Sequence, residues 1–442
     1  MKLSGWGRYP VIEAQVRAPH SVEALRAVLN SAPTVIARGN GRAYGDSAVN
    51  PSATIDMRRF NRMLAFDPQA GQLTAEAGVL LGDIITALLP RGWFPGVTPG
   101  TKFGTLGGMI AADVHGKNHH RDGSFRTCVD WIDVMGADGA IRRCSMQENV
   151  DLFEHTLGGM GLTGIIVRAA IRLRSVNTAW VRQTTLPMPN LKAAMAAFEQ
   201  AQAATYSVAW IDCLKAGAGL GRSLIMLGEH AQVADLSERQ ARRPLSIPAS
   251  GTLTMPFDRF PSGALNRFTV RACNALYYRI GARKAGPRLV DWNRYFYPLD
   301  AILGWNRIYG RKGFVQFQCV LPLNSSESGL SALLTAIAKA GSGSFLAVLK
   351  RFGSQRSRFA FPMEGYTLAL DFPVTAATFT LLDRLDRITV DHGGRFYLAK
   401  DSRLSAQTLR AADSRVERFV QMREDNGWTQ RFHSAQAARL SI

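Results

Sequence analysis

The sequence predicts an α+β fold in two domains, with an antiparallel sheet in the second. Its 442 residues exceed what one hydrophobic core usually accommodates, so at least two folding units are expected. The first part of the chain is rich in glycine and short strand patterns. After about residue 178, Ala-rich helical segments and longer strand patterns alternate, which favours an α+β unit with antiparallel strands. We therefore place a domain boundary near residue 178.

Helices are predicted from apolar spacing and from the residues that end it. Residues 21–30 have helical spacing behind a serine cap. A second helix is expected at residues 79–92, where Pro90 and Gly92 stop the pattern, and a third at residues 191–204.

Strands are predicted from alternation and from flanking turns. In residues 164–174, apolar side chains alternate with Arg168 and Arg172, which predicts a strand with one packed and one solvated face. The other strands are expected at residues 34–40, 53–57 and 72–78 (the last two separated by a polar turn at 67–71), 207–213, 223–229, 313–322, 343–353 and 365–373.

Composition narrows the class of protein. The chain carries 53 Lys and Arg against 34 Asp and Glu, a net charge of +19, which favours anionic partners such as nucleic acid, an acidic membrane surface or a phosphorylated substrate. Cations and aromatics are interleaved in residues 255–295, typical of either a membrane-surface segment or a solvated face. No apolar run is long enough to span a bilayer, and residues 1–20 lack the apolar core of a secretory signal. The five dispersed cysteines indicate reduced thiols.

Glycine clusters indicate where a nucleotide would bind. Residues 38–46 and 99–108 form two glycine-rich loops whose N–H groups could approach phosphate oxygens, because no Cβ blocks them. A third cluster at residues 159–164 matches GxGxxG, but a helical pattern precedes it and a strand follows. That order is the reverse of a Rossmann fingerprint, so NAD-type binding is rejected.

The three glycine-rich segments, together with segments further along the chain, resemble those of a known protein family. The chain resembles the vanillyl-alcohol-oxidase superfamily, and more narrowly the decaprenylphosphoryl-β-D-ribose 2′-oxidases, in RGNGRAYGD, PGTKFGTLGGMIAADVHGKNHH, GGMGLTGIIVRA and RFYLAKDSR. The likeness continues in order through SVAWID, YFYPLD, GWNRIYG, GFVQFQCVLP, FLAVLKRFG and LDFP, so it covers nearly the whole chain. It implies a two-domain PCMH-type FAD-binding fold. Residues 1–178 and a returning segment, 395–442, would bind flavin, and residues 179–394 would form the substrate domain.

The resemblance also implies how FAD is held. In the superfamily the first loop often carries a histidine bonded to the flavin, but here Arg42 stands in that place, so dissociable FAD is expected. No metal is expected, because His115 and His119 lie in a glycine-containing segment without a matching carboxylate. The residues that the resemblance places at FAD are Arg38, Gly39, Asn40, Gly41, Arg42, Ala43, Tyr44, Pro99, Gly100, Thr101, Gly104, Thr105, Gly107, Gly108, His115, Gly116, Asn118, Gly161, Gly164, Ile165, Tyr397 and Lys400.

Oxidation of a secondary alcohol by flavin requires a positioned C–H bond, an acceptor for the hydroxyl proton and cations near the reduced ring. The resemblance places Lys400, His115 and Tyr297 in catalytic positions: Lys400 would stabilise anionic flavin or bind the oxidised oxygen, and His115 would donate or accept a flavin-proximal hydrogen bond. The resemblance places Trp210, Trp305, Gln316, Gln318, Lys350 and Phe352 around the substrate. Mycobacterial members carry a cysteine at the position of Ala369, so thiol chemistry is absent there.

The implied reaction is oxidation of the 2′-hydroxyl of a polyprenyl-phosphoryl-β-D-ribose, the first half of epimerisation to an arabinose donor used in arabinan of the cell envelope. The implied partners are the lipid substrate, a short-chain reductase and a membrane surface. The expected location is cytoplasmic or peripheral at the inner membrane, with the periplasmic face left open. Two alternatives stay open: an aldonolactone or sugar-alcohol oxidase, and a basic nucleic-acid-binding protein, although no nucleic-acid motif is recognised.

Overall fold

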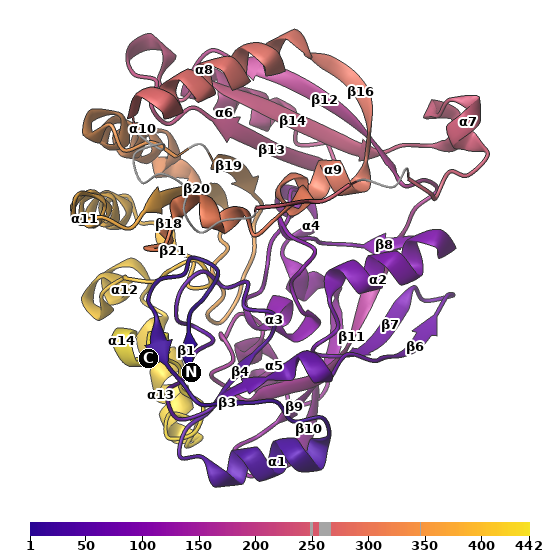
Figure 1. The fold of residues 1–442 in the computed structure, drawn as a ribbon, viewed down its shortest axis with the longest axis vertical. Helices are drawn as coiled ribbons and strands as arrows, with labels where there is room; N and C mark the ends of the chain where they lie inside the picture. The colour runs from indigo at the N-terminus through magenta and orange to yellow at the C-terminus, as the bar shows by residue number, and fades with distance from the viewer. Residues whose placement is uncertain (248–250, 256–266, 345) are drawn as a thin grey trace.

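The computed structural model describes residues 1–247, 251–255, 267–344 and 346–442. It is a mixed helix-and-sheet structure whose two large sheets are antiparallel; the sequence predicts this for the second sheet only. Residues up to 175 form a six-stranded sheet and a small parallel sheet, and residues 180–396 form an eight-stranded sheet (Figure 1).

The six-stranded sheet runs in the order β10-β9-β11-β7-β6, with β8 also paired to β11. The small sheet has the order β3-β5-β4 and is parallel. The elements of this part are β1 (Lys2–Leu3), β2 (Ile12–Glu13), β3 (Val16–Arg17), α1 (Val22–Ser31), β4 (Ile36–Arg38), β5 (Thr54–Asp56), β6 (Met63–Asp67), β7 (Gln72–Glu76), α2 (Leu81–Leu88), β8 (Trp93–Pro95), α3 (Leu106–Ala111), α4 (His119–Asp122), β9 (Val129–Met135), β10 (Ile141–Ser145), α5 (Val150–Thr156) and β11 (Ile165–Ser175).

The eight-stranded sheet runs in the order β16-β12-β14-β13-β19-β20-β18-β21. The remaining elements are β12 (Trp180–Met188), α6 (Leu191–Gln200), β13 (Tyr206–Ile211), β14 (Ser223–His230), α7 (Glu238–Ala241), β15 (Leu253–Thr254), α8 (Arg267–Arg283), β16 (Gly286–Asp291), α9 (Trp292–Phe296), β17 (Ile302–Leu303), β18 (Phe314–Pro322), α10 (Leu323–Ala340), β19 (Ala347–Phe352), β20 (Gly365–Pro373), α11 (Ala376–Asp391), β21 (Arg395–Phe396), α12 (Ala406–Ala412), α13 (Val416–Asp425) and α14 (Ala435–Leu440).

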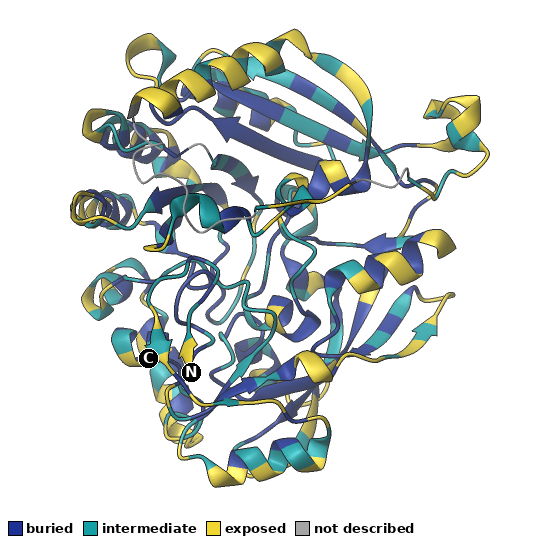
Figure 2. Ribbon diagram, viewed as in Figure 1, coloured by how far each residue is buried: buried dark blue, intermediate teal, exposed yellow. Residues whose placement is uncertain are grey.

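Alternation along the central strands of this sheet separates two environments. On β18, Val315, Phe317 and Cys319 belong to a large core that also contains the apolar side chains of α6, α10 and α11. Gln316 and Gln318 lie on the opposite face, because successive side chains of a strand point to opposite sides. Figure 2 shows the strands of this sheet as largely buried. One face of the sheet is therefore packed by helices, and the other is free to form a site.

The C-terminal segment returns to the beginning of the chain. Val35 and Phe432 form a parallel β-bridge, and Val35 N donates to Arg431 O at 2.8 Å. Figure 1 shows α12, α13 and α14, in yellow, beside the first third of the chain. The end of the sequence thus contributes to the same part of the molecule as the first glycine loop.

Most predicted elements are present. Ser21 caps α1 by accepting from Ala24 N at 3.1 Å, and α2 ends before Gly92, which has a left-handed φ of 82°. The predicted α6 and the five later strands are also present, as β13, β14, β18, β19 and β20. The strands that were not predicted are β1, β2, β3, β6, β8, β9, β10, β12, β15, β16, β17 and β21.

The prediction for residues 164–174 is correct in type but wrong about its faces. Ile166 and Ala170, on the face expected to be solvated, are 5% and 0% exposed. Register shifts after Ile166 and Ala170 change which side chains point to each face, and α3 packs against the strand. As a result β11 is buried on both faces, and only Arg168 and Arg172 within 164–174 are exposed.

The basic segment of residues 255–295 is only partly described. Its aromatics Phe257 and Phe260 and the cation Arg259 lie outside the described residues. Beyond that gap, α8 packs against β12 and β14 and leaves Phe268, Leu276 and Ile280 exposed. Within the part of the chain that the structure describes, no helix has the length and apolar character needed to cross a bilayer.

Candidate active site

The structure brings the two glycine-rich loops into contact. A Cβ on Gly39 would lie 2.1 Å from Thr105 Oγ1, so only glycine allows this approach. Asn40 Nδ2 donates to Phe103 O at 3.0 Å, which ties the loops together. Thr105 in turn caps α3 by accepting from Gly108 N. Loops that are about 60 residues apart in sequence therefore form one wall.

The third glycine cluster joins the same wall. Met160 N donates to Ala111 O at 2.8 Å, which holds the cluster against α3. Gly161 and Gly164 have φ of 78° and 150°, a backbone region that side chains with a Cβ rarely adopt. At Gly164 a Cβ would also lie 2.4 Å from a methyl group of Val134.

These loops and the polar face of the eight-stranded sheet enclose one elongated cavity. Most of the residues predicted at FAD or substrate line it. They are Gly39, Asn40, Gly41, Arg42, Ala43, Tyr44, Pro99, Gly100, Thr101, Gly104, Thr105, Gly107, Gly108, His115, Gly161, Gly164, Trp305, Gln316, Gln318, Lys350, Tyr397 and Lys400.

Seven predicted residues lie outside this lining, and three of them support the loops from behind. Arg38 donates from Nη2 to Ser4 O at 2.7 Å and fixes the start of the first loop. Asn118 Nδ2 donates to Gly96 O at 2.8 Å, and a Cβ at Gly116 would lie 2.7 Å from Asn118 Oδ1. These contacts shape the cavity without lining it.

The other four are packed in the interior. Ile165 belongs to the core beneath α1, and Phe352 packs edge-on against His115 at 4.7 Å between ring centroids. The buried Tyr297 hydroxyl bonds Thr98 Oγ1, and burial raises the pKa of Tyr297 above its usual range. Trp210 is covered by Tyr277 of α8, at 4.8 Å between centroids.

The sheet contributes a continuous polar floor to the cavity. In the β18–β20 register Gln316 lies opposite Asp371 and Gln318 opposite Ala369. On the other side of β20, β19 places Lys350 opposite Thr367. Thr367 and Asp371 are four positions apart on β20, so the floor extends over about 13 Å along the strand.

Hydrogen bonds within this floor fix its amides. Gln316 Nε2 donates to Asp371 Oδ1, and Gln318 Nε2 donates to Thr367 Oγ1 at 3.2 Å and to His115 Nε2 at 3.1 Å. Both amide nitrogens thus have partners inside the protein. Because His115 Nε2 accepts here, the proton of the neutral ring lies on Nδ1, which has no partner among the described residues.

Lys400 lies near the Asp371 end of the polar floor. Its Nζ is 3.7 Å from the ring centroid of Tyr44, and Tyr44 N donates to Ala399 O at 2.9 Å. Burial lowers the pKa of Lys400 to about 7; Asp371 opposes this change and Lys350 adds to it. Burial, reinforced by Lys350, also holds the pKa of His115 well below its usual range. The site therefore gathers basic side chains whose charged forms are disfavoured by burial.

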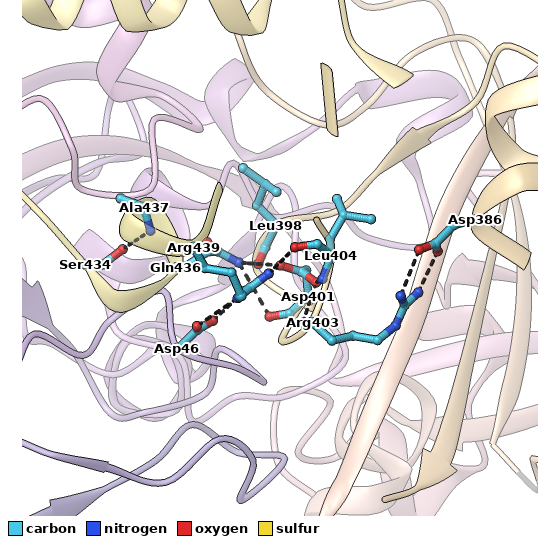
Figure 3. Close-up of polar contacts among 10 residues, drawn as sticks. All are labelled: Asp46, Asp386, Leu398, Asp401, Arg403, Leu404, Ser434, Gln436, Ala437 and Arg439. Carbon is cyan, nitrogen blue, oxygen red and sulfur yellow. Dashed lines mark hydrogen bonds and ion pairs between the residues drawn. The ribbon is translucent and has the colours of Figure 1, made fainter. Parts of the chain in front are cut away.

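A polar network around Asp401, the residue after Lys400, anchors this loop (Figure 3). Asp401 accepts from Arg439 Nη2 at 2.9 Å and from Gln436 Nε2 at 3.1 Å, both on α14. Arg439 also pairs with Asp46 at 2.8 Å, and a Cβ at Gly45 would lie 2.2 Å from Asp401 O. The C-terminal helix therefore holds the Lys400 loop against the first glycine loop.

Two acidic residues of this cavity, Asp300 and Asp371, were not predicted from the sequence. Asp300 accepts from Thr101 Oγ1 at 2.9 Å and from Lys102 N at 2.7 Å, which secures the second glycine loop. Asp371 lies in the apolar run LALDFP, where an acid in the middle of a buried strand is the signal that marks it.

Comparison with known proteins identifies the group to which this site belongs. A model of the FAD binding domain matches residues 14–145. The chain is 36% identical over 454 aligned residues to the decaprenylphosphoryl-β-D-ribose oxidase of Mycolicibacterium smegmatis, covering 100% of this chain and 97% of the relative. This chain belongs to the decaprenylphosphoryl-β-D-ribose oxidase family. It is an FAD-dependent oxidoreductase.

Other relatives align with a smaller share of this chain. An uncharacterized Streptomyces coelicolor protein is 32% identical over 82% of the chain and 100% of the relative. The L-gulonolactone oxidase of Bos taurus is 29% identical, but over only 42% of the chain and 43% of the relative.

The residues of the cavity fit FAD. Three loops that tolerate no Cβ at Gly39, Gly107 and Gly164 expose backbone to the cavity, as a bound diphosphate requires. Lys400 and the Nδ1–H of His115 are donors suited to a reduced, anionic ring. When bound, FAD supplies the hydride acceptor, and the chain supplies binding, orientation and proton transfer.

Proposed function

We propose that this enzyme oxidises the 2′-hydroxyl of a polyprenyl-phosphoryl-β-D-ribose to the 2′-keto form. The relative from M. smegmatis bears the name of this substrate class. In this reading a short-chain reductase then reduces the ketone on the opposite face and completes epimerisation to the arabinose donor of envelope arabinan.

The observation that carries the proposal is Lys350. It lines the cavity from β19, burial lowers its pKa to about 8, and no acidic side chain of the described chain pairs with it. A buried cation without a counter-ion is unfavourable, and a substrate phosphate would offset that cost. A neutral sugar lactone would not.

The deciding experiment measures loss of the visible flavin absorbance under anaerobic conditions. We expect a synthetic prenylphosphoryl ribose to bleach the flavin, whereas L-gulono-1,4-lactone does not. Lys350→Gln should raise the substrate KM at least tenfold, and Lys350→Arg should restore much of it. Bleaching by the lactone alone would favour the alternative, an aldonolactone or sugar-alcohol oxidase.

Lys400 is proposed as the cation nearest to the reaction. Its position over Tyr44, and its loop fixed by Asp401, support a role in steadying negative charge on the reduced cofactor or on the oxidised oxygen. Lys400→Ala should abolish turnover and retain FAD. Substantial residual activity would remove Lys400 from this role.

We also propose that FAD is bound without a covalent link. Arg42 occupies the first loop, with its guanidinium 4.1 Å above the Trp6 ring and 4.8 Å above the Phe103 ring. Among the described residues that line the cavity there is no cysteine and one histidine, His115, whose Nε2 accepts from Gln318. Acid precipitation should release all the yellow colour into the supernatant. Flavin retained in the pellet would contradict the proposal.

The two large sheets support a division of the chain into two domains. We propose a flavin domain formed by residues 1–178 and 395–442 and a substrate domain formed by residues 179–394. The link between Val35 and Phe432 supports the discontinuous first domain, and the single sheet from β12 to β20 supports the second.

We further propose a peripheral membrane position, at the inner membrane, through the exposed face of α8. A prenyl chain would reside in a bilayer, so an enzyme that oxidises its headgroup gains from lying at the surface. The net charge of +19 and the apolar side chains of α8 are suited to an anionic membrane.

A further inference from the structure

An alcohol oxidation needs an acceptor for the hydroxyl proton, and only a few cavity groups could serve. Among the described residues that line the cavity, the acidic side chains are Asp300 and Asp371. Both oxygens of Asp300 already accept, from the Thr101 hydroxyl and from Lys102 N. Asp371 accepts at Oδ1 from Gln316, and no donor among the described residues reaches its Oδ2.

The two other candidate proton acceptors, His115 and Lys400, are less suited to this role. His115 Nε2 accepts from Gln318, so its lone pair is occupied, and Nδ1 carries the proton. Burial lowers the pKa of Lys400 to about 7, whereas Asp371 and the face of the Tyr44 ring favour its protonated form. In that form Lys400 stabilises negative charge and accepts no proton.

The surroundings of Asp371 favour a basic carboxylate. It is 1% exposed, and burial raises its pKa to about 7, opposed by the Gln316 hydrogen bond and by Lys400. The titratable groups that face it are Lys400 from the loop after β21, Tyr44 from the first glycine loop and Tyr309 from the segment before β18. A general base works best when its proton affinity is matched to the working pH.

We propose that Asp371 is the general base of the reaction, with Gln316 orienting its carboxylate. As the carbon-bound hydrogen leaves with its electron pair for FAD, the hydroxyl proton passes to Asp371 Oδ2 and the C–O bond becomes a carbonyl. Two electrons and one proton go to FAD, and one proton goes to the carboxylate. The inference rests on the proposed function only in that the oxidised group is an alcohol.

Asp371→Asn tests the base with little change of shape, because the amide oxygen still accepts from Gln316. We expect the variant to keep its FAD content and substrate Kd, while the rate of anaerobic flavin reduction falls 10²- to 10⁴-fold. In the wild type that rate should rise as pH increases through about 7, and Asp371→Asn should lose this rise; deprotonation of Lys400 in the same range can only lower the rate. Asp371→Glu should restore the pH dependence. The surface variant Asp138→Asn is the matched control and should behave as wild type.

A second readout needs no substrate. Ionisation of a carboxyl beside the cofactor should shift the visible spectrum of the oxidised holoenzyme with a midpoint near pH 7, and Asp371→Asn should lose that shift. If the prenylphosphoryl ribose fails to reduce the wild type, the proposed substrate is wrong, and the rates are compared with the sugar or lactone that does. If the rate of anaerobic flavin reduction in Asp371→Asn stayed within tenfold of the wild-type rate, Asp371 would not be the general base. An unchanged spectral titration in this variant would overturn the proposal as well.

Discussion

Arg439 and Asp401 form a partly buried ion pair at 2.9 Å, and the same guanidinium reaches Asp46 at 2.8 Å. One side chain from the last helix thereby joins the residue after Lys400 to the end of the first glycine loop. Arg439 holds the pKa of Asp401 below its usual range despite burial. The relative position of Lys400 and the cofactor loop depends on this link.

Arg439→Met should therefore destabilise the protein strongly. The buried Asp46 would lose its Arg439 partner, and Asp401 would keep only hydrogen bonds from uncharged donors such as Gln436. Removal of one member of a buried pair typically costs about 3–5 kcal/mol. The free energy of unfolding, from urea denaturation, should fall by about 3 kcal/mol, and FAD should bind more weakly. Arg142→Met, which removes a pair that is exposed on both sides, should cost less than about 1 kcal/mol. Equal effects of the two substitutions would contradict the assigned role.

Stability should fall when the pH is lowered from about 6.5 toward 4. Burial, reinforced by Arg174, lowers the pKa of His230 to about 4 from its ordinary 6.5. In this window the unfolded chain binds a proton that the folded chain does not, so acid favours unfolding. Burial lowers the pKa of His119 in the same direction, to about 3.

The measurement is the slope of unfolding free energy against pH between 4.5 and 6. His230→Asn should reduce that slope by up to one proton, about 1.4 kcal/mol per pH unit. His20→Asn, at an exposed position, should leave the slope unchanged. Slopes are compared because His230→Asn also loses the contact with the Tyr206 hydroxyl and lowers stability at every pH.

The sequence predicts those parts of the site that depend on residues close together in the chain. Gly39, Gly161 and Gly164 could be identified because close approach or positive φ demands glycine, and Lys400 because its motif is specific. Asp371 was missed because its importance depends on pairing with Gln316 across two strands, and strand register is not readable from one sequence. A single acidic residue in an apolar run does not indicate which residues of the neighbouring strands it faces.

Long-range packing explains the remaining differences. Trp210 lies outside the cavity lining because Tyr277 of α8 covers it, a contact between segments 67 residues apart. Strand β16 was missed because GPRLVD is short, basic and begins with Gly-Pro, features that normally discourage a strand. At the edge of the sheet Pro287 is tolerated.

Ala369→Cys should place a reactive thiol in the cavity. Ala369 lines it, opposite Gln318 on β18 and Val348 on β19. In a Cys273→Ser background, which removes the exposed native thiol, methyl methanethiosulfonate should add one label per chain to Ala369→Cys and almost none to the parent, because the other four cysteines are buried. Labelling should block flavin reduction, and the prenylphosphoryl ribose should protect. Absence of labelling would place position 369 away from the accessible cavity.

The exposed face of α8 should govern binding to anionic vesicles. Phe268, Leu276 and Ile280 are 66%, 59% and 42% exposed, beside the exposed cations Arg271, Arg279 and Arg283, whereas Val270 and Asn274 dock the helix on the sheet. Replacing the three apolar residues by serine should therefore spare the fold.

Pelleting with phosphatidylglycerol vesicles should fall at least fivefold in this triple variant, because the buried apolar area that holds the helix at the interface is lost. The matched control replaces Val11, Leu64 and Met146 by serine; these are equally exposed apolar residues on other elements, and their loss should leave pelleting unchanged. Binding of both variants should weaken with salt, since their cations are retained. If the α8 variant pelleted like wild type, the membrane contact would have to lie elsewhere.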